Sequence, residues 1–417
     1  MSALQPVRGT HDLLPDDFAR HAHVVDTART LAARYGFREL ATPLLEFTEV
    51  FQRTLGETSD VVSKEMYAIE DRHQSGERVS LRPEYTAGIC RAVMSNGLYN
   101  AGALRFFAHG PMFRYERPQK GRQRQFHQID AEIIGVAEPQ ADIEVIALGW
   151  DILGALGLRD KATLEINTLG DSASRQAYRA ALVEYFSARR DRLSEDSRAR
   201  LERNPLRILD SKDPGDRALI EHAPLFEHHL NDAAKAFFAR VRQGLDAIGV
   251  PYVVNQRLVR GLDYYTHTAF EFVTTHLGAQ GALIAGGRYD GLIEAMGGRP
   301  TPGIGWAGGI ERLAMLCGQA AATPRPVAVI PIGEAAELPA LKLAHELRAA
   351  GITVEMGYRG NLKRRMEQAN KAKAAWAVLL GESELAAGQA TLRNLDSGAQ
   401  EAVALSALAQ RLAAPRP

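Results

Sequence analysis

The sequence predicts an α+β fold built on a largely antiparallel sheet and interrupted by a helical insertion, followed by a smaller α/β domain. Three observations indicate this arrangement. Strand-like runs recur between residues 106 and 285 with few helical patterns between them, which favours antiparallel pairing. A polar, helix-forming stretch occupies about residues 172–249. After residue 326, strand and helix patterns alternate as in a parallel α/β sheet.

The first expected element is a helix that begins at Pro15. An early proline followed by two acids is typical of a helix N-terminus, and apolar residues then recur at helical spacing as far as Tyr35. Residues 37–45 are interpreted as the first strand. Pro43 removes one hydrogen-bond donor from it, which indicates a sheet edge or a kink.

Further strands of the larger domain are expected at residues 106–113, 125–135, 163–167, 252–254, 269–273 and 282–285. The stretch at 172–249 is charged and is broken at Asn204-Pro205. We interpret it as a helical insertion; a solvated connector is the alternative.

A domain boundary is expected near residues 319–326, where an Ala-, Thr- and Pro-rich stretch precedes a new β run. The larger domain would cover residues 1–322 and the smaller one residues 326–417. In the smaller domain we expect strand 327–331, helix 338–349, strand 352–356, helix 362–373 and strand 375–380.

Composition narrows the class of protein. Lys plus Arg and Asp plus Glu both number 50, so any contact with nucleic acid has to come from local patches. Cys90 and Cys317 are the only cysteines and form no CxxC pair, which argues against structural zinc and disulfides. No apolar stretch is long enough to cross a membrane, and the first twenty residues lack a signal-peptide pattern. We therefore expect a cytoplasmic protein without membrane contact.

A basic loop follows the strand expected at 106–113. From Arg114 to Arg124 there are five cations and one anion, Glu116, around a Pro- and Gly-containing turn. Guanidinium groups bind phosphate bidentately, and Phe126 beyond the loop offers a flat surface for stacking a base. On charge alone, a solvated basic hairpin fits equally well.

Two further stretches carry candidate chemistry. Arg260, Asp263, Tyr264 and Tyr265 lie beside a glycine in an apolar run, which is typical of a polar ligand pocket; a structural Arg–Asp pair with core tyrosines fits as well. Residues 303–308 spell GxGxxG, but the expected βαβ context is missing and no GxxxxGK[ST] occurs. Neither a Rossmann nor a P-loop site is predicted.

These stretches occur in the order of the three motifs of class II aminoacyl-tRNA synthetases. The first helix with its Pro43 strand resembles motif 1, the arginine loop motif 2, and the Gly-rich strand leading to Arg312 motif 3. The runs at 8–12 (RGTHD), 82–84 (RPE), 258–265 (LVRGLDYY) and 285–290 (AGGRYD) resemble histidyl-tRNA synthetases of the bacterial type. The resemblance covers about residues 6–412, and the C-terminal part is similar to the family's anticodon-binding domain.

The resemblance implies which residues bind ATP. Arg114 would hold the α-phosphate and the histidine carboxylate, Phe126 would stack on adenine, and Glu116 would read the adenine edge. Arg312 would hold the γ-phosphate, and Arg260 would place positive charge at the α-phosphate during the reaction. The implied catalytic residues are Arg260 and Arg114, and the implied ATP-binding residues are Arg114, Glu116, Arg122, Phe126 and Arg312.

A second set of residues is implied for histidine. Glu84, Thr86 and Gln128 would contact its amino group. Glu132 and Tyr265 would read the two ring nitrogens, which need one acceptor and one donor. The implied histidine-binding residues are Glu84, Thr86, Arg114, Gln128, Glu132, Arg260, Tyr264 and Tyr265.

The chain departs from the family pattern near Glu84. The family usually has glycine after Arg-Pro-Glu, whereas Tyr85 stands there in this chain. Its bulky side chain is a reason to expect an altered loop around Thr86. Residues 129–131 also differ from the expected pattern between Gln128 and Glu132.

In the C-terminal part, basic residues concentrate on the helix expected at 362–373. Lys363, Arg364 and Arg365 are the candidate tRNA contacts, with Lys371 and Lys373 farther along. Phosphate neutralisation by such residues provides salt-dependent affinity. A solvated helix face is the alternative.

The resemblance implies a histidine–tRNA ligase that forms histidyl-adenylate from histidine and ATP and transfers histidine to tRNA(His). Mg²⁺ would enter with ATP; no zinc or other protein-bound metal is expected. The resemblance also implies a homodimer with motif 1 at the two-fold interface. Two alternatives stay open: a non-catalytic paralogue such as the regulatory subunit of ATP phosphoribosyltransferase, and a synthetase for threonine, proline or glycine.

Overall fold

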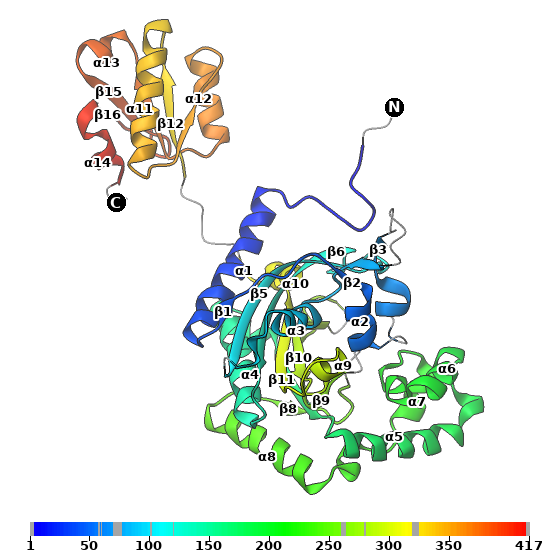
Figure 1. The fold of residues 1–417 in the computed structure, drawn as a ribbon. Coiled ribbons are helices and arrows are strands. Elements are labelled where there is room, and N and C mark those ends of the chain that lie inside the picture. Colours follow the sequence, from blue (N-terminus) through cyan, green and yellow to red (C-terminus); the bar gives the residue numbers. More distant parts are fainter. Residues whose placement is uncertain are drawn as a thin grey trace. The chain divides into compact units, whose positions relative to one another are not determined.

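The computed structural model describes residues 4–56, 59, 61–69, 77–100, 102–119, 121–259, 264–278, 281–318 and 325–413. The chain divides into two compact units, Met1–Ala320 and Ala321–Pro417 (Figure 1). Each unit has its own sheet and its own apolar core. No helix among the described residues is long and apolar enough to cross a membrane.

An eight-stranded sheet forms the centre of the first unit. Its strands are β1 (Arg38–Glu39), β5 (Leu104–Phe113), β6 (Gln125–Ile134), β7 (Thr163–Thr168), β8 (Val253–Val254), β9 (Thr266–Thr274), β10 (Gly281–Arg288) and β11 (Gly303–Gly309). They lie in the order β1-β5-β6-β11-β10-β9-β7-β8. The outer pairs β1/β5 and β7/β8 are parallel and the inner pairs antiparallel, which confirms the predicted sheet.

Four helices cover one face of this sheet: α1 (Pro15–Arg34), α4 (Pro139–Ala155), α8 (Asp232–Ala247) and α10 (Ile310–Leu316). Their apolar side chains form one cluster with Ile129 and Ile133 of β6. Successive side chains of a strand point to opposite faces. Gln128, Asp130 and Glu132 of β6 therefore face the other side of the sheet.

The opposite face is only partly covered. The helices α3 (Thr86–Ser95) and α9 (Leu292–Ala295) pack there with β5 and β6 in a second apolar cluster. The helix α2 (Thr48–Leu55) packs against α3 and directly follows β2 (Leu45–Phe47). This strand belongs to a small antiparallel sheet with the order β2, β4 (Val79–Leu81), β3 (Ala68–Ile69). A pocket opens beside these elements.

The helix predicted from Pro15 is confirmed, but the strand predicted at residues 37–45 is wrong in its length. Only β1 pairs in the large sheet, at its edge, whereas β2 pairs in the small sheet. Between them, the guanidinium of Arg82 donates to the carbonyl of Thr42 at 2.8 Å. The chain therefore crosses from one sheet to the other at Pro43, which has no N–H to add to a ladder.

The predicted insertion is helical. It consists of α5 (Ser172–Ser187), α6 (Glu195–Arg203), α7 (Pro214–Ile220) and α8, and α6 ends directly before Asn204-Pro205 as expected. Tyr178, Phe186 and Phe226 belong to a separate buried cluster that holds these helices together. Because the segment has a core of its own, the solvated-connector alternative is wrong.

The second unit has a five-stranded sheet with the order β13-β12-β14-β15-β16. Its strands are β12 (Val327–Pro331), β13 (Val354–Met356), β14 (Trp376–Leu380), β15 (Gln389–Asn394) and β16 (Gln400–Ala404), and its helices are α11 (Glu337–Ala349), α12 (Leu362–Lys371), α13 (Glu382–Ala386) and α14 (Leu408–Ala413). The first three strands are parallel, as predicted. The sheet is mixed, however, because β15 and β16 add an antiparallel hairpin that was not predicted.

Candidate active site

One pocket on the open side of the large sheet brings together ten residues that the sequence singled out. They are Glu84, Thr86, Arg114, Glu116, Arg122, Phe126, Gln128, Tyr264, Tyr265 and Arg312. Of the remaining candidates in this unit, Glu132 lies just beneath the lining, and Arg260 lies outside the described residues.

The antiparallel hairpin of β5 and β6 places the cationic side of the pocket. Arg114 follows β5 directly, and its Nε donates to the carbonyl of Pro83 at 2.9 Å. Its guanidinium also lies over the ring of Phe126, 5.2 Å from the centroid. The carboxylate of Glu116 is 3.2 Å from Arg122 and 3.9 Å from Arg114. These contacts orient the loop before any ligand binds.

Arg312, at the start of α10, completes the cationic side. Its Nη1 donates to the carbonyl of Ala282 at 2.6 Å, and its Nε approaches the carbonyl of Gly121 at 3.4 Å. Burial and the nearby charge of Arg122 lower the pKa of the Arg312 guanidinium. Several cations thus meet with little opposing charge, an arrangement that suits a polyanionic ligand such as a triphosphate.

Acidic groups form the opposite end of the pocket. Glu84 is buried, and its carboxylate accepts from the backbone N–H of Ala87 at 2.9 Å. Glu132 is fully buried, and its two oxygens accept from the hydroxyls of Thr86 at 2.6 Å and Tyr289 at 2.5 Å. Both hydroxyl-bearing residues line the pocket. Burial raises the pKa of Glu84 and raises the pKa of Glu132 to about 8.

Gly305 explains the glycine-rich strand. It lines the pocket directly above Glu132, and a Cβ at this position would lie 1.6 Å from the Oε2 atom of Glu132. Gly305 therefore leaves room for an acid beneath the pocket floor, and the GxGxxG run of β11 is part of a strand. The run does not form a dinucleotide-binding turn.

Tyr289 was not singled out as a site residue, although it lies in the run at 285–290 that carried the resemblance. Its hydroxyl is one of the two that fix Glu132. No local pattern links a tyrosine after β10 with an acid on β6, because the sheet brings them together from positions 157 residues apart.

Tyr85 does not remove Thr86 from the pocket, contrary to the expected alteration of the loop. Its side chain is 1% exposed, and its hydroxyl donates to the carbonyl of His109 at 2.7 Å. The guanidinium of Arg82 lies 4.0 Å from the ring centroid. The bulk of Tyr85 is thus directed into the core, and Thr86 lines the pocket.

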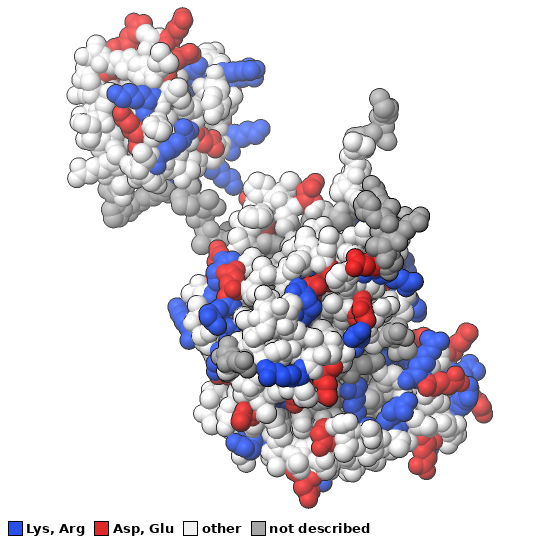
Figure 2. Space-filling model, in the orientation of Figure 1, with Lys and Arg blue, Asp and Glu red and all other residues white. Residues whose placement is uncertain are grey.

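In the second unit, one candidate tRNA contact has to be corrected. Arg365 is 9% exposed, its Nη1 donates to the carbonyl of Pro331, and its Nη2 lies 3.7 Å from Glu337. Its guanidinium anchors α12 to the sheet and is unavailable to RNA. Lys363 and Arg364 are exposed, and basic side chains project from the edge of the unit where α12 lies (Figure 2).

Comparison with known proteins identifies the family. A protein-family model described as histidyl-tRNA synthetase matches residues 9–313, and one described as anticodon binding domain matches residues 326–414. The chain belongs to the histidyl-tRNA synthetase family. It is 59% identical over 414 residues to a histidine–tRNA ligase of Rhodospirillum rubrum and 60% identical over 413 residues to one of Gluconacetobacter diazotrophicus, with 99% of each chain covered.

A solved structure agrees with this assignment. The apo histidyl-tRNA synthetase of Staphylococcus aureus is 32% identical and superimposes with a TM-score of 0.82, covering 98% of this chain and all of the other. Family membership confirms the predicted class II fold and an aminoacyl-tRNA synthetase activity.

The buried acid at the pocket floor should make stability depend on pH. Because the pKa of Glu132 is about 8 in the folded chain, against 4.5 ordinarily, the folded state binds more protons between these values and loses stability as pH rises through them. In Glu132→Gln, which keeps the volume and one acceptor oxygen but cannot ionise, this loss should vanish. We expect the stability of this variant relative to the parent to increase by about 2–3 kcal/mol between about pH 6 and pH 9.

Differential scanning calorimetry at several pH values measures this difference. Glu294→Gln, at an exposed acid of α9 in the same unit, serves as the control. If the difference between Glu132→Gln and the parent were constant with pH, the assigned titration of Glu132 would be wrong.

Proposed function

We propose that this protein is a histidine–tRNA ligase. A carboxylate oxygen of histidine attacks the α-phosphorus of ATP, the bond to pyrophosphate breaks, and histidyl-adenylate forms. The terminal ribose hydroxyl of tRNA(His) then attacks the adenylate carbonyl and AMP leaves. The supporting observation is a single pocket with guanidinium groups at one end and buried carboxylates at the other. ATP and tRNA are cytoplasmic, so the reaction belongs in the cytoplasm.

The cationic end would receive ATP. Arg114 would contact the α-phosphate and the histidine carboxylate, Phe126 would stack on adenine, and Arg312 would hold the γ-phosphate. Electrostatic stabilisation and positioning account for the rate, because no protein nucleophile is required. The role of Arg260 at the α-phosphate rests on the family resemblance alone.

The acidic end would receive histidine. The carboxylate of Glu84 can pair with the α-ammonium group, assisted by Thr86 and Gln128. Glu132 and Tyr265 would read the ring nitrogens. Each oxygen of Glu132 has a second lone pair beyond the hydrogen bond it already accepts, so it can accept an imidazole N–H as well.

Mg²⁺ would enter with ATP. Sites of this kind usually combine substrate phosphates with one or two carboxylates. Glu116 is already paired with Arg122 and Arg114 and is expected at the adenine edge, so phosphate oxygens and water would supply most of the ligands of the ion. Mg²⁺ would offset phosphate charge, while the arginines orient the triphosphate.

The regulatory paralogue is disfavoured as the alternative. The ligases named above match this chain over nearly its whole length, and the anticodon-binding model matches its C-terminal part. Histidine-dependent ATP–pyrophosphate exchange tests the proposal directly. Exchange with histidine but not with threonine, proline or glycine is expected. Exchange absent with histidine, or equal with another amino acid, would refute it.

The chain should be a homodimer. Its motif 1 region exposes apolar side chains, including Phe18, Leu45 and Phe47, and β1 leaves an open edge of the large sheet. Apolar groups of this kind are expected to be covered by a second copy. Sedimentation velocity at micromolar concentration should give twice the mass of one chain. A fully active monomer under these conditions would contradict the expectation.

We assign adenylation to residues 1–322, including the insertion at about 172–249, and a separate contribution to tRNA binding to residues 326–417. From residue 325 onward the chain carries 12 Lys and Arg against 9 Asp and Glu. The excess of positive charge is small, so the contact with tRNA should come from the exposed face of α12 that carries Lys363 and Arg364.

A chain that ends near Ala322 should therefore retain histidine-dependent pyrophosphate exchange, provided that it stays folded and dimeric. It should charge tRNA poorly, mainly through a raised KM for tRNA, because phosphate contacts are lost. The full-length double variant Lys363→Ala, Arg364→Ala serves as a milder comparison with both units intact. If the shortened dimer charged tRNA as well as the full chain, the C-terminal unit would have another purpose.

A further inference from the structure

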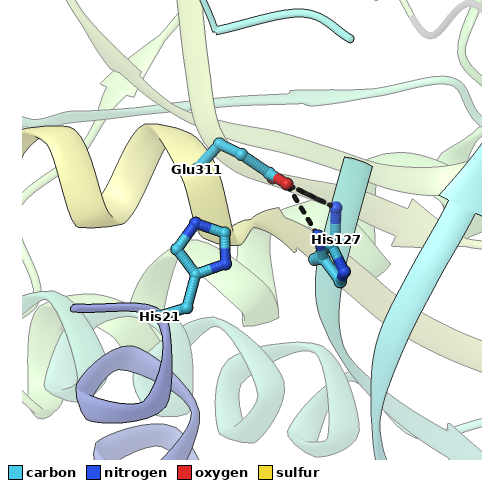
Figure 3. A group of neighbouring side chains, drawn as sticks. All are labelled: His21, His127 and Glu311. Carbon is cyan, nitrogen blue, oxygen red and sulfur yellow. Dashed lines mark hydrogen bonds and ion pairs between the residues drawn. The ribbon is translucent and has the colours of Figure 1, made fainter. Parts of the chain in front are cut away.

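Three side chains with metal-binding atoms converge between helices α1 and α10 and strand β6. His21 comes from α1, His127 from β6 and Glu311 from α10, and one ligand atom of each lies within 4.8 Å of the others (Figure 3). The rings of His21 and His127 meet edge to face, with centroids 5.6 Å apart. This cluster lies on the helix-covered side of β6, because Phe126 and Gln128 on either side of His127 line the reaction pocket.

Two of the three groups are held in place by each other. The Nδ1 atom of His127 lies 2.9 Å from a carboxylate oxygen of Glu311, and the backbone N–H of His127 donates to the same carboxylate at 2.9 and 3.1 Å. Glu311 is thus fixed against β6. The backbone N–H bond is an outer contact of the kind that orients a ligand before an ion arrives.

The position of His21 favours a metal site over a purely structural contact between β6 and α10. An imidazole–carboxylate bond between β6 and α10 needs only His127 and Glu311. The ring of His21 has no hydrogen-bond partner among the residues that the structure describes, yet it points into the same space (Figure 3). A tetrahedral ion has four ligands, and sites with one open position take three of them from the protein. His21 would supply the third protein ligand.

We propose that His21, His127 and Glu311 bind one divalent ion of the Zn²⁺ type. Two imidazoles and one carboxylate with an open fourth position are a known ligand set for Zn²⁺, whereas Mg²⁺ prefers oxygen ligands alone. The fourth position would hold water. A second pocket, lined by His11, Asp17 and Cys317 among others, borders His21 and Glu311 and gives an ion a path of entry.

The geometry requires only small adjustments. At bond lengths of about 2.0–2.1 Å, ligand atoms of a tetrahedral site lie roughly 3.3 Å apart. The 2.9 Å distance between Nδ1 of His127 and the carboxylate of Glu311 would increase slightly. Rotation of the His21 side chain would bring its ring nitrogen nearer to both. If Nδ1 of His127 is the ligand, its proton moves to Nε2, so the imidazole stays neutral.

The absence of CxxC from the sequence does not address this site. It argued against a cysteine-based zinc site, whereas these ligands come from residues 21, 127 and 311, which only the fold brings together. An ion here would tie α1 to β6 and α10. It would stabilise the fold at a point where Glu311 also borders the reaction pocket.

The test uses the full chain after chelation, with no nucleotide or amino acid present. Titration with Zn²⁺ alone, followed by calorimetry, should give one ion per chain and a higher Tm, because the ion binds only the folded state. Co²⁺ should give the intense visible bands of a tetrahedral site. His21→Asn should weaken Zn²⁺ binding by at least tenfold and remove these bands.

His23→Asn is the matched control, because His23 lies on the same helix but outside the cluster; it should bind Zn²⁺ like the parent. Glu311→Gln provides a second loss-of-ligand variant, and each metal-free Tm verifies folding. The proposal is overturned if the parent binds no ion, or if His21→Asn and Glu311→Gln bind Zn²⁺ as tightly as His23→Asn.

Discussion

Replacing Glu132 with alanine is expected to lower kcat/KM for histidine by roughly 10⁴-fold, with the loss appearing mainly in the KM for histidine and little change in the KM for ATP. Glu132 has no exposed surface, and its carboxylate is held by Thr86 and Tyr289. Without it, a polar ring nitrogen of the substrate would be buried unpaired, which a site built for hydrogen bonding rejects strongly.

Pyrophosphate-exchange kinetics, with histidine and ATP varied in turn, measure the KM for each substrate separately. Glu132→Gln is the matched comparison: it keeps the volume and an acceptor oxygen, so its effect should be much smaller than that of alanine. Tyr289→Phe, which removes one of the two hydroxyls that orient Glu132, should also raise the KM for histidine rather than for ATP. Equal effects of Glu132→Ala on both substrates would undo the assignment.

Local patterns predicted most strands of the large sheet and the parallel part of the C-terminal sheet, but they did not predict α3, α4 or the small sheet β2-β4-β3. Proline followed by acids located the start of α1, and strand-like runs located β5, β6, β9 and β10. The failures have physical reasons. Residues 37–45 contain enough apolar residues for one strand. The chain leaves the large sheet within this segment, because the guanidinium of Arg82, from a distant segment, donates a hydrogen bond to the carbonyl of Thr42. The strand β16 is mostly exposed and therefore has no apolar alternation to detect.

Contacts between distant segments also limited what could be predicted about the pocket. The family motifs identified ten of its residues, because each motif keeps residues of related function within one stretch of chain. Tyr289 was missed because its importance comes from contact with Glu132 across the sheet. Arg365 was grouped with Lys363 and Arg364 by adjacency, yet neighbouring positions on a helix point about 100° apart, and this one turns inward.

Arg114 illustrates how the structure adds to the motif. In sequence it is one of several cations in a loop. In the structure its Nε is committed to the carbonyl of Pro83, and Pro83 precedes Glu84 of the acidic end. Its Nη1 lies 3.9 Å from the carboxylate of Glu116, and the guanidinium carbon lies over the ring of Phe126. The side chain therefore links the proposed ATP and histidine subsites and is oriented before either substrate binds.

Arg114→Ala should consequently lower histidine-dependent pyrophosphate exchange by about 100- to 1,000-fold, the usual loss when one preorganised donor to a developing charge is removed. Arg114→Lys keeps the charge but loses the planar fork, so it should recover only part of the rate. Arg105→Ala is the control: Arg105 lies on the same β5 strand, pairs with Glu144 at 2.8 Å outside the pocket, and should leave exchange unchanged. Circular dichroism and Tm establish that all three variants fold. If Arg114→Ala exchanged pyrophosphate at the rate of Arg105→Ala, the charge that stabilises the reaction would have to come from elsewhere in the pocket, and the catalytic assignment of Arg114 would be wrong.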